Sequence, residues 1–103
     1  MRQIRIISEG NIVVETVPKP VAGQGEVLLD IKYVGFCGSD LNTFLGRNLM
    51  AKEAVVPGHE ISAVIKETGV GVPNFLKPGM AVTVNPYTNC GYCAACHSGH
   101  GNA

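Results

Sequence analysis

The chain has 103 residues, of which 46% are hydrophobic and 16% charged, a composition typical of one globular domain with its own core. Its eight Lys and Arg balance eight Asp and Glu, and without a basic cluster we expect no binding to nucleic acid or to a membrane surface. Charges interrupt the N-terminal segment, which argues against a signal peptide, and no apolar run is long enough to cross a bilayer, so we expect a cytoplasmic protein.

The first part of the chain alternates short β segments with turns. Residues 3–7 and 11–17 are β-rich, and Ser8-Glu9-Gly10 between them predicts a hairpin. Residues 18–25 are expected to form a loop, because two prolines stop the strand and two glycines permit a sharp reversal. Residues 26–34 alternate with a period of two, which predicts a strand with one mostly apolar face.

A short helix and two further strands are expected next. Ser39 or Asp40 is a suitable N-cap, and the apolar spacing before Gly46 predicts a helix of one or two turns. Residues 61–67 and 80–84 alternate again between apolar and polar positions. Several short strands with one short helix predict a mainly β fold, a small and mostly antiparallel barrel or sandwich.

Three residues with metal-binding side chains lie beside the predicted helix and the strand after it. Cys37 follows a strand and precedes the helix, where the positive end of the helix dipole favours a thiolate. His59 and Glu60 begin the next strand. A thiolate, an imidazole and a carboxylate brought together would bind zinc with an open position for water or substrate. Taken singly, such residues are more often structural, so a structural or assembly domain with packed Cys37 and His59 is a competing hypothesis.

The segment from Asn85 onward has no strand pattern and too few apolar side chains to order itself, which indicates a bound metal. Cys90, Cys93 and Cys96 recur at intervals of three residues, a spacing that lets three thiolates converge on one tetrahedral ion. In a cytoplasmic protein, cysteines spaced in this way favour a metal site over disulfides.

Other interpretations of this tail stay open. A structural zinc site of four cysteines needs one more thiolate, for which His97 or His100 could substitute. An iron–sulfur cluster, in a non-enzymatic metal-binding or electron-transfer module, would require a fourth cysteine where His100 stands. A reduced tail without metal and a disulfide to Cys37 are the remaining alternatives.

Five short motifs occur together, from the first strands to the end of the chain. They are Gly25-Glu26-Val27-Leu28, Gly35-Phe36-Cys37-Gly38-Ser39-Asp40, Pro57-Gly58-His59-Glu60, Lys77-Pro78-Gly79 and Cys90-x2-Cys93-x2-Cys96. In this order they resemble the zinc-dependent medium-chain alcohol dehydrogenases, with the sorbitol and threonine dehydrogenases as the nearest branches. The resemblance implies a GroES-like, partly open β-barrel with a short helix and a C-terminal metal-binding lobe. Residues 1–84 would form the catalytic-domain core and residues 85–103 an incomplete structural-zinc lobe, with a Rossmann domain expected beyond the chain end.

The resemblance also implies a role for each residue of the upstream site. Cys37 and His59 would hold the catalytic Zn²⁺, with Glu60 as a direct ligand or a nearby carboxylate. Ser39 would begin the route by which the proton of the alcohol leaves. Asp40 would steady His59 from behind, as metal-binding histidines usually require.

For the tail, the resemblance implies that Cys90, Cys93 and Cys96 hold a structural Zn²⁺. The fourth cysteine is expected one position past the last residue of this sequence. The full-length protein would oxidise a small alcohol or polyol with NAD or NADP and form a homo-oligomer, whereas this chain alone should bind no nicotinamide cofactor. Asn42 stands where the family often continues the proton relay with a histidine, so the route beyond Ser39 is open.

Overall fold

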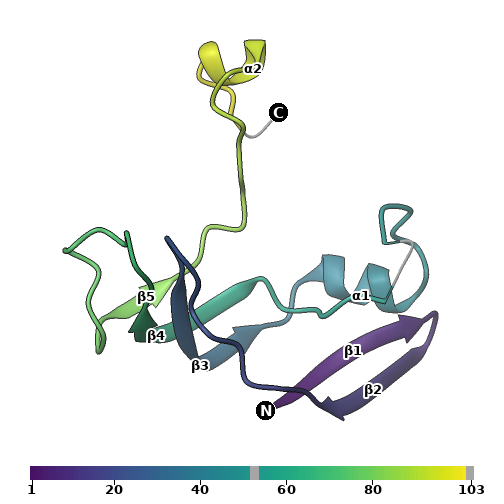
Figure 1. Cartoon of the computed structure of the whole chain (residues 1–103). Coiled ribbons are helices and arrows are strands. Elements are labelled where there is room, and N and C mark those ends of the chain that lie inside the picture. Colours follow the sequence, from purple (N-terminus) through teal and green to yellow (C-terminus); the bar gives the residue numbers. More distant parts are fainter. Residues whose placement is uncertain (52–53, 102–103) are drawn as a thin grey trace.

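The computed structural model describes residues 1–51 and 54–101, and the strands and the first helix occur in the predicted order (Figure 1). The elements are β1 (Arg2–Ser8), β2 (Asn11–Thr16), β3 (Val27–Gly35), α1 (Gly38–Phe44), β4 (Glu60–Thr68), β5 (Ala81–Thr83) and α2 (Ala94–His97). All pairings between these strands are antiparallel. The last two residues of the predicted lobe 85–103 lie outside the described residues, and the boundary after residue 84 stays a prediction.

The hairpin of β1 and β2 forms where the sequence predicts it. Gly10 closes the turn with a φ of 68°, which glycine adopts without steric cost. Ile6 pairs with Ile12 across the hairpin and is buried. The backbone of Ile6 also exchanges two hydrogen bonds with Val55, with N···O distances of 2.9 and 3.0 Å. This bridge ties the hairpin to the segment that leads into β4.

The second sheet has the strand order β3-β4-β5 and contains most of the small core. β4 lies in its centre, and Ala63 and Ile65 are buried as the alternation of residues 61–67 predicted. The predicted barrel does not close within the described residues, because the hairpin and this sheet remain separate. Pro18 and Pro20 follow β2, and they lack the N–H groups that would extend its pairing toward the second sheet.

The predicted apolar face of β3 is interrupted by two shifts in register. One lies between Leu28 and Leu29, where the extra residue belongs to β4, and the other lies between Ile31 and Tyr33, where Lys32 is the extra residue of β3. Leu28, on the other face, is buried, whereas Ile31 and Tyr33 on the predicted apolar face are 45% and 77% exposed. The period of two therefore predicted the strand but not the face that it buries.

Helix α1 begins earlier than predicted, and neither Ser39 nor Asp40 is its N-cap. Cys37 caps the helix, with extended backbone angles of φ −92° and ψ 157°. Asp40 is instead the third helical residue, and its Oδ2 accepts the N–H of Cys37 at 3.0 Å, which is one half of a capping box. The helix ends at Phe44, before Gly46 with a φ of 66°, as predicted.

Gly69 follows β4 and lies where the chain touches the loop before β3. Its N–H donates to the carbonyl of Glu26 at 2.8 Å, and a Cβ on Gly69 would overlap the carbonyl oxygen of Gly23. Gly69→Ala is therefore expected to force the loops apart and to lower the free energy of unfolding by about 2–3 kcal/mol. Urea denaturation measures this change, with Gly38→Ala as control, because a Cβ there would meet nothing within 4 Å. Equal stability of the two variants would contradict the expectation.

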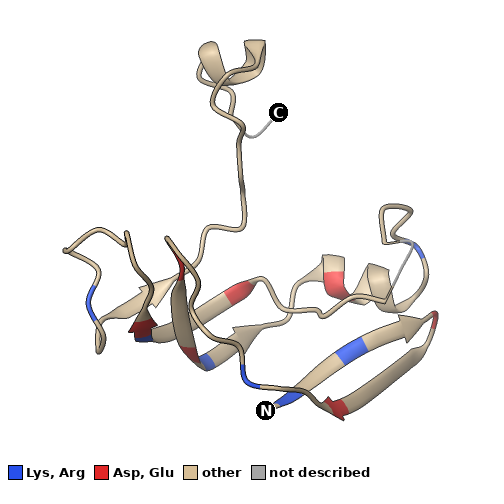
Figure 2. Cartoon of the chain, viewed as in Figure 1, with Lys and Arg blue, Asp and Glu red and all other residues tan. Residues whose placement is uncertain are grey.

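The tail leaves the second sheet after β5 and stands away from both sheets, with α2 at its far end (Figure 1). The sequence did not predict α2, a helix of four residues. A single turn is not stable by itself in water, which agrees with the expectation that something else orders the tail. Charged residues of both signs are spread over the strands and loops (Figure 2). Within residues 1–51 and 54–101, no helix has the length and apolarity that a bilayer span requires.

Candidate metal centre

Cys37 lies in the short connection between β3 and α1. β3 ends two residues before it and the helix begins one residue after it, so its backbone is fixed from both sides. The backbone N–H and the hydroxyl of Ser39, followed by His59, lower the pKa of the Cys37 thiol, and Glu60 opposes this shift. A lowered pKa favours the thiolate, which is the form that binds a metal.

His59 and Glu60 reach the site from the beginning of β4. Gly58 precedes them with a φ of 100°, and a Cβ on it would lie 2.6 Å from Cγ1 of Val34. Glycine is therefore required at this turn both for its backbone conformation and for its close approach to β3. The turn sets the direction in which His59 leaves the backbone.

The structure brings the three residues named from the sequence together. One ligand atom from each of Cys37, His59 and Glu60 lies within 4.8 Å of the other two. All three line an open hollow of about 660 Å³, which Tyr33 and Tyr87 also line. A small molecule can therefore reach the atoms that would bind an ion.

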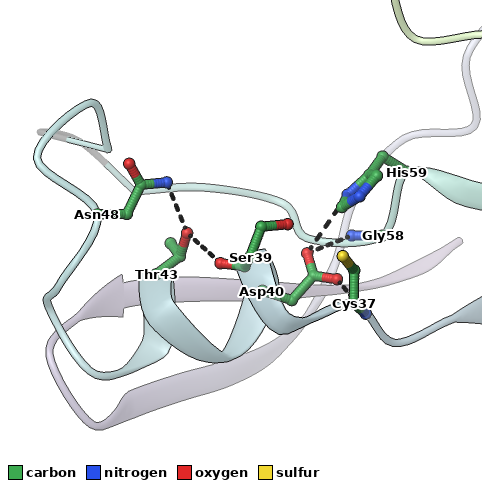
Figure 3. A network of polar contacts seen from close by, with 7 residues as sticks. All are labelled: Cys37, Ser39, Asp40, Thr43, Asn48, Gly58 and His59. Carbon is green, nitrogen blue, oxygen red and sulfur yellow. Dashed lines mark hydrogen bonds and ion pairs between the residues drawn. The ribbon is translucent and has the colours of Figure 1, made fainter.

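Asp40 connects the two segments that carry these residues (Figure 3). Its side chain is 6% exposed, Oδ2 accepts the N–H of Cys37 at 3.0 Å and Oδ1 accepts the N–H of Gly58 at 3.3 Å. One buried carboxylate thus joins the start of α1 to the turn before β4. This arrangement fixes the distance between Cys37 and His59 before any metal binds.

The same carboxylate faces the imidazole of His59. Oδ1 of Asp40 lies 3.7 Å from Nδ1 of His59, which is too long for a hydrogen bond but close enough for a charge interaction. The Cys37 thiol raises the pKa of His59 most, and Asp40 raises it further, against the opposite effect of burial. With Nδ1 turned toward Asp40, Nε2 is the ring nitrogen left for a metal.

Ser39 lies in the first turn of α1 with an exposed side chain. Its carbonyl accepts the hydroxyl of Thr43 at 3.0 Å, and the hydroxyl of Thr43 accepts the side-chain amide of Asn48 at 3.0 Å (Figure 3). These contacts brace the helix through its backbone and leave the Ser39 hydroxyl beside Cys37. Asn42 lies in α1 and is exposed.

The second cluster lies in the tail, where Cys96 Sγ is 3.8 Å from Cys90 Sγ and 3.5 Å from Cys93 Sγ. Two thiolates on a tetrahedral zinc ion, with bonds of about 2.3 Å, lie about 3.8 Å apart. The backbone N–H groups of Tyr92 and Cys93 lower the pKa of the Cys90 thiol to about 7. These distances match those between thiolates on one zinc ion, and the lowered pKa of Cys90 favours the thiolate form.

The two histidines of the tail do not join this group of thiols within the described part of the chain. His97 is the last residue of α2, and Nδ1 of His100 lies 3.1 Å from the hydroxyl of Ser98. All four cysteines are free, so the disulfide alternative is not realised in this structure.

Both clusters have donor sets that fit zinc. A sulfur, a nitrogen and a carboxylate oxygen match a catalytic site with three protein ligands and one open position. Three thiolates match a structural zinc site that is one ligand short. Thiolate donors disfavour magnesium and calcium, which take oxygen ligands.

The backbone contacts of Asp40 and the steric need for Gly58 were not predicted from the sequence. An aspartate three residues after a helix N-cap is a known sign of a capping box, and it would have indicated the first contact if Cys37 had been taken as the cap. No sequence signal indicates the second contact, because Gly58 lies on another segment.

A family model described as the alcohol dehydrogenase GroES-like domain matches residues 23–103. An uncharacterized zinc-type alcohol dehydrogenase-like protein of Haemophilus influenzae is 33% identical over 102 residues, which are 99% of this chain and 30% of that protein. A sorbitol dehydrogenase of Halalkalibacterium halodurans is 37% identical over 93 residues, which are 90% of this chain and 27% of the relative.

The fold is also similar to solved structures. A short chain alcohol dehydrogenase (rspB) from E. coli CFT073, complexed with the cofactor NADH, matches with a TM-score of 0.86 and 33% identity, over 97% of this chain and 28% of that one. The chain thus spans less than a third of the length of each of these three proteins.

Proposed function

We propose that this chain is the zinc-binding catalytic domain of a dehydrogenase for alcohols or polyols. The chain belongs to the zinc-type alcohol dehydrogenase family and corresponds to the GroES-like domain of that family. The observation that carries the proposal is the convergence of Cys37, His59 and Glu60 on atoms within 4.8 Å of one another. A relative named sorbitol dehydrogenase supports a polyol substrate, and a similar structure that holds NADH supports a nicotinamide cofactor, NAD or NADP.

In this proposal each residue of the site has a separate task. Cys37, His59 and Glu60 hold the ion, and Asp40 keeps the first two at a fixed separation. When bound, zinc would act as a Lewis acid and lower the pKa of the substrate hydroxyl. Ser39, exposed beside Cys37, accepts the proton that leaves the alcohol and passes it to water.

The tail has a structural task in the same proposal. Cys90, Cys93 and Cys96 would hold a second zinc ion that orders the segment around α2. This ion takes no part in the reaction, because the tail stands away from the sheet whose strands carry the upstream cluster (Figure 1). The nicotinamide cofactor accepts the hydride. In the related proteins it would be bound by a part of the chain that lies outside the region matched here.

Elemental analysis of the purified chain tests this assignment. We expect zinc without iron and without acid-labile sulfide, because both clusters offer donor sets that suit zinc. Iron together with sulfide would instead indicate an electron-transfer module built on the three tail cysteines. A chain that takes up no metal at all, even when zinc is supplied, would indicate a structural domain.

A further inference from the structure

Gly35 and Glu60 lie opposite each other at the ends of two paired strands. Gly35 is the last residue of β3, Glu60 is the first residue of β4, and the antiparallel register pairs them directly. Gly35 does not have a positive φ, so its backbone conformation alone would accept any residue. Another reason must account for the absence of a side chain here.

The space above Gly35 is filled by the side chain of Glu60. A Cβ on Gly35 would lie 2.6 Å from Oε2 of Glu60, 2.9 Å from its Cβ and 3.5 Å from its carbonyl oxygen. The carboxylate is the end of a flexible side chain and could swing aside, but the Cβ of Glu60 moves only with its backbone. An alanine at position 35 would therefore displace the carboxylate, the start of β4, or both.

We propose that Gly35 is a positioning residue for the metal site, because its missing side chain lets the Glu60 carboxylate lie beside Cys37 and His59. This inference rests on the proposed function. Gly35 and the three ligand residues line the same hollow, and the Glu60 oxygen is within 4.8 Å of the Cys37 and His59 ligand atoms. Gly35 does not itself contact the metal and acts only through Glu60.

Gly38 offers a matched control on the other side of Cys37. It too lacks a positive φ, and a Cβ on it would meet nothing within 4 Å. Both substitutions add one methyl group close to Cys37 in the sequence. Only the substitution at Gly35 meets the side chain of Glu60.

The test measures zinc affinity by competition with a chromophoric chelator, in the whole chain with Cys90, Cys93 and Cys96 replaced by serine. In this parent the zinc ion reports on the upstream site alone. We expect Gly35→Ala to weaken zinc binding about tenfold or more, the size of effect typical of residues that orient a ligand. Gly38→Ala should leave the affinity within about twofold, since its methyl group contacts nothing that orients a ligand.

A double-substitution cycle with Glu60→Gly identifies the route of the effect. Glu60→Gly removes both the carboxylate and the Cβ that alanine at position 35 would meet. We therefore expect Gly35→Ala to change nothing further in the Glu60→Gly background. If Gly35→Ala alone fails to fold, the inference still requires that the variant with both Gly35→Ala and Glu60→Gly folds. This double variant must then bind zinc with the same affinity as Glu60→Gly.

Three results would overturn the inference. One is an unchanged affinity in Gly35→Ala, and another is an equal loss with and without the Glu60 side chain. In both cases the parent still binds zinc, so the proposed function survives. A parent that binds no zinc removes the proposed function and the role of Gly35 together.

Discussion

Replacing Asp40 with alanine is expected to lower the free energy of unfolding of the metal-free chain by about 1–3 kcal/mol, because two partly buried N–H groups lose their acceptor and each hydrogen bond contributes about 0.5–1.5 kcal/mol net. These groups belong to Cys37 and Gly58, at 3.0 and 3.3 Å from the carboxylate. Asp40→Asn keeps one oxygen acceptor and should lose less. Urea denaturation measures the change in each variant.

Asp30 provides the control for this experiment. It is an aspartate on β3 whose carboxylate is half exposed and lies 2.7 Å from Nζ of Lys32. Exposed pairs of this kind contribute little to stability, so Asp30→Ala should leave the urea midpoint almost unchanged. If Asp40→Ala and Asp30→Ala were equally stable, Asp40 would not connect α1 to the turn before β4.

Asp40→Ala should also weaken zinc binding at the upstream site. Without Asp40 the distance between Cys37 and His59 is no longer fixed before the ion arrives, and partners that orient metal ligands typically contribute about 10–100-fold in affinity. The loss should be confined to this site, because Asp40 makes no contact with the tail among its described hydrogen bonds and ion pairs.

Cys37→Ser is expected to remove the upstream zinc ion and to leave the tail ion in place. Serine keeps the size of the side chain but offers a hydroxyl, which is a far weaker ligand for zinc than a thiolate. The zinc affinity of the upstream site should therefore fall by more than about 100-fold. This loss exceeds the one expected when a residue that only orients a metal ligand is removed. Zinc stoichiometry after dialysis against a weak chelator measures the loss as one ion fewer per chain.

Cys93→Ser is the matched variant for this comparison, since it replaces one thiol of the tail cluster. It should release the tail ion and retain the upstream one. Two independent losses would establish two separate sites. If Cys37→Ser kept its full zinc content, the upstream cysteine would be a packed residue and the domain would have a structural role.

Local patterns predicted the elements that depend on neighbouring residues. The alternation of residues 61–67 identified β4 and its buried Ala63 and Ile65, and Gly10 and Gly46 marked the hairpin turn and the helix end with positive φ angles. Such features follow from side-chain period and from backbone sterics, which the sequence states directly.

Features that depend on contacts between distant segments were not predictable in this way. The register shifts of β3 are set by its pairing with β4, and the open arrangement of the two sheets depends on all strands at once. The clearance between Gly35 and Glu60 exists only because their strands pair in one register. The sequence named Cys37, His59 and Glu60 as candidates, but only the fold shows that their ligand atoms converge.

In a crystal structure of the zinc-loaded chain, anomalous scattering at the zinc edge would locate the ion and show whether Cys37 and His59 share it. We expect an ion about 2.3 Å from Sγ of Cys37 and about 2.0–2.1 Å from a ring nitrogen of His59. Zinc found only at the tail cysteines, with Cys37 and His59 sharing no ion, would contradict it.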